Sequence, residues 1–236
     1  MTRIALRSLL PLISVAIANV SFRVIIGYGV LGGFVFAPVL PSAAAETVYT
    51  INPARSEIAV QLFKAGVGSA LAHDHVFRAT TFTGRVQIDL AAPAAGLIIV
   101  EVQTASLKAD EPTMRQKYGL PSQLSEKDRQ QIQETMLSKS QLDIEHYPVM
   151  KFTSTQIETQ TLETYTVTGT LTIRGVTQLV TFLAQVEQRE PALHIQGSFR
   201  FKQSSFGYEP YSALFGAVRN QDEVLLHFDV LAFPEM

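Results

Sequence analysis

The sequence of 236 residues contains no cysteine and no tryptophan. Without cysteine, a disulfide framework, a thiolate nucleophile and a cysteine-based zinc or iron–sulfur site are all excluded. Charged residues are sparse at 17% and hydrophobic residues reach 47%, a balance that excludes wholesale intrinsic disorder. The formal net charge of −2 lacks the basic excess of nucleic-acid-binding proteins, so we expect no nucleic acid as a partner.

Acidic residues are missing from the first 45 positions, whose only charges are three arginines, Arg3, Arg7 and Arg23. Apolar runs follow at residues 9–22 and 24–40, and small residues lead to Ala45. This order predicts a secretory signal peptide over residues 1–45, cleaved near Ala45 and Glu46. The alternative is an uncleaved anchor of residues 24–40 in the inner membrane. In both cases we expect residues 46–236 to form an exported, periplasmic domain.

From Glu46 onward the dominant hydrophobic period is two, which is typical of half-buried β-strands. The clearest case is residues 164–173, where apolar or small residues alternate with threonines. At least eight such segments follow one another with short connections, and strands that are polar on one side favour antiparallel pairing. Because a lone sheet cannot hide its apolar face or its edges, we predict an all-β fold that closes into an antiparallel β-barrel.

Two stretches interrupt this pattern. Residues 110–143 contain a helix start at Ser125, with Ile132 and Met136 four residues apart behind it, which predicts one inserted surface helix. Residues 203–220 form an irregular segment rich in aromatic residues and glycine, which we expect to cap the mouth of the barrel.

Several ordered blocks resemble the YceI-like family. They are YTINP at residues 49–53, FTGRVQID at 82–89, the pattern of Tyr147, Pro148, Phe152 and Ser154, and VTGTLTIRGVT at 167–177. The resemblance covers most of residues 46–233 and implies a lipocalin-like barrel that binds a polyisoprenoid or related lipid. It departs from the family in the long segment 110–131, and the AHDH segment at residues 72–75 is typical of a subset.

The resemblance and the alternation together predict an exported protein that holds or carries a long-chain isoprenoid, either a polyisoprenoid or an isoprenoid quinone. A small barrel either fills its interior or keeps room for one small ligand, so a solid structural or stress-related envelope protein is the alternative. Transient contact with a membrane is compatible with a lipid carrier. The residues predicted to face the interior and the lipid are Ile58, Val60, Leu62, Val86, Ile88, Val100, Val102, Phe152, Val167, Leu171, Phe182, Phe199, Phe201 and Phe228.

The triplet His73, Asp74 and His75 is the most distinctive polar feature. In an extended backbone the two histidines share a face, so they could meet a lipid head group together with Arg78, or fix a loop by hydrogen bonds. A second hypothesis is a metal site on His73 and His75, but two ligands need a third from elsewhere, such as His146, Asp110 or Glu111.

No nucleophile motif or phosphate-binding loop is present, so we expect neither an enzyme nor a cofactor. The remaining strand histidines, His194 and His227, fall on the polar register and are predicted to face solvent.

Overall fold

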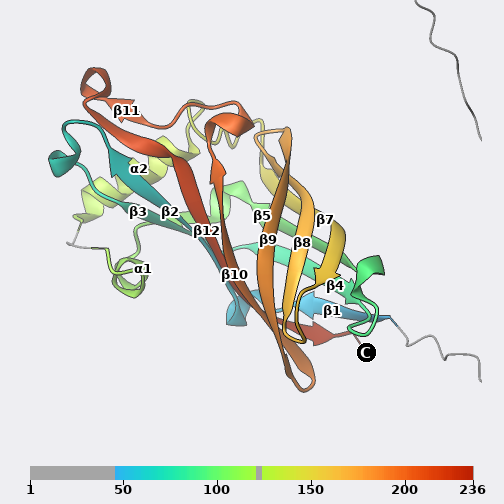
Figure 1. The fold of residues 1–236 in the computed structure, drawn as a ribbon. Coiled ribbons are helices and arrows are strands. Elements are labelled where there is room, and N and C mark those ends of the chain that lie inside the picture. The colour runs from blue at the N-terminus through green and yellow to red at the C-terminus, as the bar shows by residue number, and fades with distance from the viewer. Residues whose placement is uncertain (1–45, 121–123, 236) are drawn as a thin grey trace, which may run out of the picture. The chain divides into compact units, whose positions relative to one another are not determined.

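The computed structural model describes residues 46–120 and 124–235 (Figure 1). The predicted leader, residues 1–45, lies outside the described residues, so its cleavage stays a prediction. The strands are β1 (Thr47–Ile51), β2 (Glu57–Ala65), β3 (His75–Ala79), β4 (Phe82–Ile88), β5 (Leu97–Gln103), β6 (Leu107–Ala109), β7 (Val149–Thr159), β8 (Thr164–Ile173), β9 (Val176–Arg189), β10 (Ala192–Lys202), β11 (Ser212–Ala213) and β12 (Val218–Pro234).

Eight of the described strands form a closed antiparallel barrel in the order β1-β4-β5-β7-β8-β9-β10-β12. The ring closes because the last residues of β12 pair with β1, with Ile51 opposite Ala232. In β8, Tyr165, Val167 and Leu171 are buried, while the threonines between them point outward. The predicted all-β barrel is therefore confirmed, and closure leaves its ring without an exposed edge.

One side of the barrel is extended by three more strands, β2, β3 and β6. Strand β2 follows β1 after the 3₁₀ turn η1 (Pro53–Arg55) and pairs with β12, while β3 pairs with both β2 and β6. The outer edge of β6 is covered by a glutamine side chain. The amide of Ala109 donates to Gln133 Oε1 (2.7 Å), and Gln133 Nε2 donates to the carbonyl of Leu107 (2.5 Å). The side chain thus takes the place of a neighbouring strand.

That glutamine belongs to the predicted helix, α2 (Glu126–Leu137). Its N-cap is Ser125, whose hydroxyl accepts from the amide of Asp128, and Met136 is buried against the barrel interior. The helix thus forms part of the wall.

A second helix, α1 (Pro112–Lys117), was not predicted, because six residues are too few to show a helical period and Pro112 suggests a loop. Proline is nevertheless favourable in the first turn of a helix, where its missing amide is not needed.

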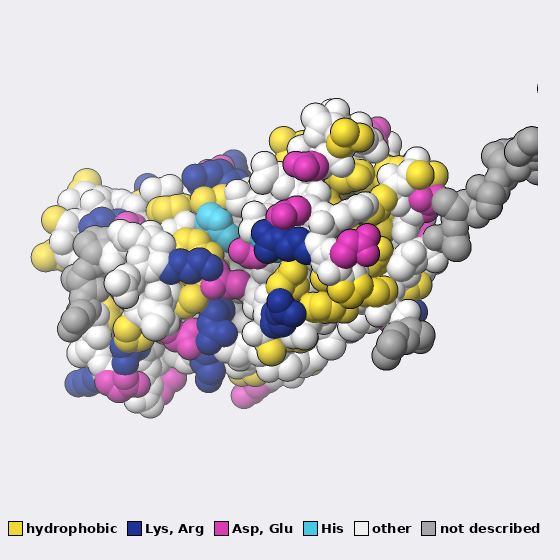
Figure 2. All heavy atoms as spheres, turned by 90° about the horizontal axis from the view of Figure 1, so that it is seen from below, with side chains coloured by type: hydrophobic (Ala, Val, Ile, Leu, Met, Phe, Trp, Pro, Cys, Tyr) yellow, Lys and Arg dark blue, Asp and Glu magenta, His cyan; other side chains and the backbone are white. Residues whose placement is uncertain are grey.

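Helix α1 covers the outer face of β2 and β3. Its Met114 packs against Ala59 and Val76, which are 1% and 0% exposed although they point away from the barrel interior. On the face seen in Figure 2, side chains of both charges are interspersed with hydrophobic and uncharged polar ones. Among the described residues, no helix is long and apolar enough to cross a membrane.

Candidate functional site

The barrel encloses a cavity of about 530 Å³, within the usual range of small-molecule sites of roughly 300–1,000 Å³. Its walls are inward side chains of the barrel strands, with α2 along one side. Many of these side chains, Val60, Val100 and Phe182 among them, are only partly buried although they point inward. They remain accessible because they border open space. The interior is thus not the solid core of the alternative hypothesis.

Of the fourteen residues predicted to face the interior, all but Ile88 line this cavity. Ile88 is 6% exposed and packs in the core with Ile157, close to Gly96. Alternation identifies the face on which a side chain lies, but not whether empty space or another side chain lies opposite it.

One end of the cavity is aromatic. Phe182 stacks on Phe199 with the ring centroids 4.7 Å apart. It also contacts Phe228 edge-on at 5.3 Å and the tilted ring of Phe152 at 5.5 Å. A Cβ atom at Gly197 would lie 2.4 Å from the ring of Phe228, so only glycine lets this ring lie over β10. This end offers a ligand only apolar contacts.

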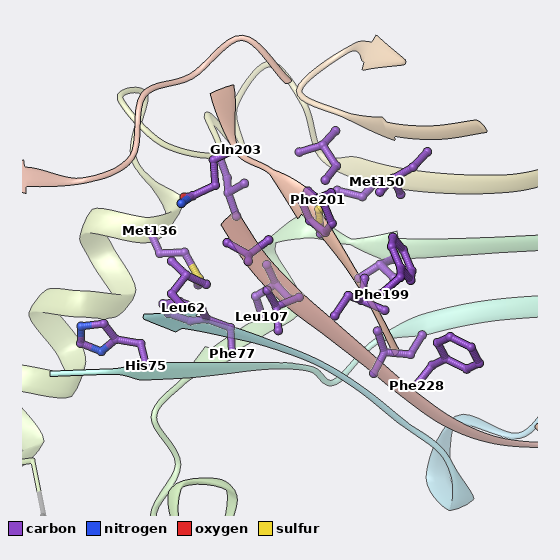
Figure 3. Close-up of a pocket in the computed structure, with 18 of the residues that line it drawn as sticks. Leu62, His75, Phe77, Leu107, Met136, Met150, Phe199, Phe201, Gln203 and Phe228 are labelled. Atoms are coloured by element: carbon purple, nitrogen blue, oxygen red, sulfur yellow. The ribbon is translucent and has the colours of Figure 1, made fainter. Parts of the chain in front are cut away.

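The other end is polar and contains His75 (Figure 3). His75 Nδ1 lies 2.6 Å from Oδ2 of Asp110, which is fully buried. The other carboxylate oxygen accepts from Arg115 Nη1 (2.6 Å) and from the amide of Val76 (3.1 Å). Burial by itself would raise the pKa of Asp110, but the hydrogen bond and charge of His75, with the hydrogen bonds from Arg115 and the amide of Val76, hold it below its ordinary value. Asp110 therefore stays ionised and accepts the Nδ1 proton, which leaves Nε2 as the ring nitrogen available to a ligand.

The other residues of the triplet have separate positions. His73 is exposed and borders the cavity, so both histidines adjoin the same space. Asp74 supports the backbone instead, because its carboxylate accepts from the amide of Lys64 (2.7 Å). Arg78 lies on the outer face of β3 and makes two hydrogen bonds to Glu111, at 2.7 and 2.8 Å. The hydrogen bonds with Glu111 raise the pKa of Arg78, and Arg78 does not line the cavity.

For the metal hypothesis, the structure supplies no third ligand. Across residues 46–120 and 124–235, no group of three or more histidine or carboxylate side chains is placed to hold a metal ion. Of the suggested partners, Asp110 is engaged with His75 and Arg115, Glu111 pairs with Arg78, and His146 bonds to Asp143.

Sequence reasoning missed several cavity residues on the irregular segments. Gln203 is 2% exposed and donates from Nε2 to the carbonyl of Gln221. Tyr208 also lines the cavity, and burial raises its pKa well above the ordinary value. The predicted cap at residues 203–220 is therefore present in part, because Gln203 and Tyr208 line the cavity and Phe206 between them is buried. Helix α2 also faces the interior through Ile132 and Met136, and the spacing of these two apolar residues could have indicated this from the sequence.

The expectation that His194 and His227 face solvent was wrong for His194, and His227 is partly buried. His194 is 8% exposed, and its Nε2 lies 2.7 Å from Asp229. His227 lies beneath Tyr118, with ring centroids 4.9 Å apart, and burial lowers the pKa of its imidazole. Both do lie on the outer face, but a polar register does not reveal that other segments cover that face.

A family profile described as "YceI-like domain" matches residues 49–232. A UPF0312 protein of Pseudomonas putida strain W619 is 35% identical over 103 residues, which is 44% of this chain and 44% of that protein. The matched stretch thus spans less than half the length of that relative.

Solved structures of similar fold include BcnA of Burkholderia cenocepacia, with 22% identity, a TM-score of 0.60, and coverage of 77% of this chain and 98% of that one. A polyisoprenoid binding domain from Saccharophagus degradans has 11% identity and a TM-score of 0.53, and covers 81% of this chain and 100% of that one. At these identities the likeness shows the fold alone.

Proposed function

Because the chain belongs to the YceI-like family, we propose that it is an exported carrier that holds a long-chain isoprenoid, of polyisoprenoid or isoprenoid quinone type, in the barrel. The observation that carries this proposal is the cavity of about 530 Å³, whose lining is mainly apolar with polar side chains at one end. Each methylene group buried there stabilises the complex by roughly 0.8 kcal/mol, so affinity grows with chain length. The similar fold of the polyisoprenoid binding domain from Saccharophagus degradans supports the same ligand class.

The two ends of the cavity suggest how such a lipid lies. The hydrocarbon chain occupies the aromatic end around Phe182 and Phe228, and the polar terminus lies at His75. Since Asp110 holds Nδ1 of His75, Nε2 is the ring nitrogen left to form a hydrogen bond with a polar group at the end of the lipid. We infer a role in binding without chemistry, because the sequence contains no cysteine and places no serine in a recognisable nucleophile motif.

Export rests on the sequence of residues 1–45, with its arginines, apolar runs and small-residue exit. N-terminal sequencing of the protein recovered from the periplasmic fraction tests it. A mature end at Glu46 supports export with cleavage, whereas recovery of the intact chain in the inner-membrane fraction supports the anchor of residues 24–40. Recovery in the cytoplasm with an intact N-terminus would contradict both.

The ligand is tested by extracting the purified protein with organic solvent and analysing the extract by mass spectrometry. We expect an isoprenoid in near-stoichiometric amount. A matched pair of variants, His75→Gln and His75→Phe, tests the polar end: glutamine keeps a hydrogen-bonding group, whereas phenylalanine removes it. Absence of any lipid, together with no binding of added polyprenol or quinone, would exclude the proposed function.

A further inference from the structure

Two uncharged segments meet at the end of the barrel where β2 leads into β3. Residues 65–73 and 210–218 contain no Asp, Glu, Lys or Arg. They lie side by side, since the amide of Gly68 donates to the carbonyl of Ala217 (2.8 Å) (Figure 1). A Cβ atom at Gly66 would lie 2.3 Å from that same carbonyl oxygen, so glycine permits the close approach.

Large apolar side chains project from both segments. Val67 and Leu71 of the first are 98% and 78% exposed, and Leu214 and Phe215 of the second are 66% and 112% exposed. Together with Tyr211, which is 41% exposed, we call these residues the apolar rim. Isolated exposed apolar residues are ordinary on a protein surface, but a cluster from two adjoining segments marks an interaction site.

The backbone beneath the rim adds a second observation. Leu214 and Phe215 have φ angles of +50° and +54°, in the left-handed region that bulky side chains rarely adopt. Asparagine or glycine would occupy these positions with less strain. Strained conformations persist mainly where function requires them, and here they direct a leucine and a phenylalanine into solvent.

The rim is continuous with the mouth of the cavity. Ala72 and His73 end the first segment, Tyr211 and Val218 belong to the second, and all four line the cavity. A lipid that enters or leaves at this end therefore passes directly beside the rim.

We propose that the apolar rim inserts into the surface of a phospholipid bilayer, so that the isoprenoid passes between membrane and cavity without crossing water. This inference rests on the proposed function. A bilayer fits better than a protein partner. Side chains that project from the surface can enter the lipid interface directly, whereas a protein partner would need a complementary groove for them. The lack of charge in both segments means that insertion desolvates no ionised side chain.

The absence of tryptophan provides a direct probe. Phe215→Trp introduces a single indole at the rim, and Leu162→Trp introduces one at the other end of the strands, where Leu162 is 94% exposed. Each variant is expressed from the full gene and purified after whatever processing of its N-terminus the cell carries out. On adding phosphatidylcholine vesicles, we expect a blue shift for Phe215→Trp and quenching by brominated acyl chains, with no change for Leu162→Trp.

A second pair of variants preserves the fold while removing the rim. The double variant Leu214→Asn and Phe215→Asn suits the left-handed backbone, so it is expected to fold. We expect the double variant to partition into vesicles about tenfold less or weaker still, because burying one large apolar side chain can by itself change the partition coefficient about tenfold. Leu162→Asn is the matched control and should leave partitioning unchanged.

Lipid binding is measured separately, by loading each variant with a polyprenol in detergent. If the asparagine variant loads normally but exchanges lipid with vesicles at least tenfold more slowly, the inference holds. If no variant binds lipid yet the Phe215→Trp emission still shifts, the proposed function fails and docking stands. An unshifted emission with normal loading overturns docking, as does a concentration-dependent dimer that buries the indole in the absence of vesicles.

Discussion

Adding volume inside the cavity provides the sharpest test of a hollow barrel. Val100 lines the cavity and is only partly buried, opposite Phe152 in the neighbouring strand. In a close-packed core, replacing valine with phenylalanine would cost about 1–3 kcal/mol through overpacking. If the space beside Val100 is open, the ring of Val100→Phe enters it and buries roughly 40 Å² of additional apolar surface. At about 25 cal/mol per Å², this stabilises the lipid-free protein by about 1 kcal/mol.

The same substitution should weaken lipid binding. The benzyl group adds about four carbon atoms and excludes a comparable length of hydrocarbon from the cavity. At about 0.8 kcal/mol per methylene group, the loss is roughly 3 kcal/mol, or about two orders of magnitude in Kd.

Val76→Phe is the matched control, since Val76 is 0% exposed on the outer face of the same sheet, beneath α1. It should destabilise by about 1–3 kcal/mol and leave lipid affinity unchanged. Urea denaturation of delipidated protein gives the stabilities, and titration with a polyprenol gives the affinities; delipidation matters because bound ligand itself stabilises the folded state. If Val100→Phe destabilised as much as Val76→Phe and still bound lipid normally, the reasoning from an open cavity would be refuted.

Two further predictions concern buried titratable groups. Asp110→Ala should destabilise by about 3–5 kcal/mol in urea denaturation, because it leaves the buried Arg115 without its carboxylate, and Asp110→Asn should cost less. The native pKa of Asp110 is below its ordinary value of 3.8, so its contribution is present above that pH and is lost as pH falls through the native pKa. Burial also lowers the pKa of His227 from its ordinary value of 6.5. As pH falls below about 6.5, the imidazole of the unfolded chain is protonated before that of the folded protein, so the free energy of unfolding declines. In His227→Gln the free energy of unfolding should change less steeply between pH 7 and 5 than in the unsubstituted protein. An unchanged slope would show that burial of His227 does not contribute to the pH dependence of stability.

The strands and the faces of their side chains could be predicted because period two is a local property. In β8, neighbouring residues point to opposite sides whatever the rest of the chain does, so threonine outside and valine or leucine inside follow from the residue order. The same holds for the N-cap at Ser125, where a side chain bonds to an amide three residues away.

The polar end of the site could not be predicted in this way. His75, Asp110 and Arg115 meet only because α1 follows β6 across the outside of β3, and the histidine and the aspartate are 35 positions apart. No local pattern distinguishes an aspartate that fixes an imidazole from one at the surface. The cover over His227 has the same origin, since Tyr118 follows α1.

By itself, the sequence determined which side chains point inward, because alternation along a strand depends on neighbouring residues alone. Only the tertiary structure decided that Val86 and Val100 border open space while Ile88 packs in the core. The volume left inside a barrel depends on how its strands close and on which side chains meet across it, and these contacts join residues far apart in the chain.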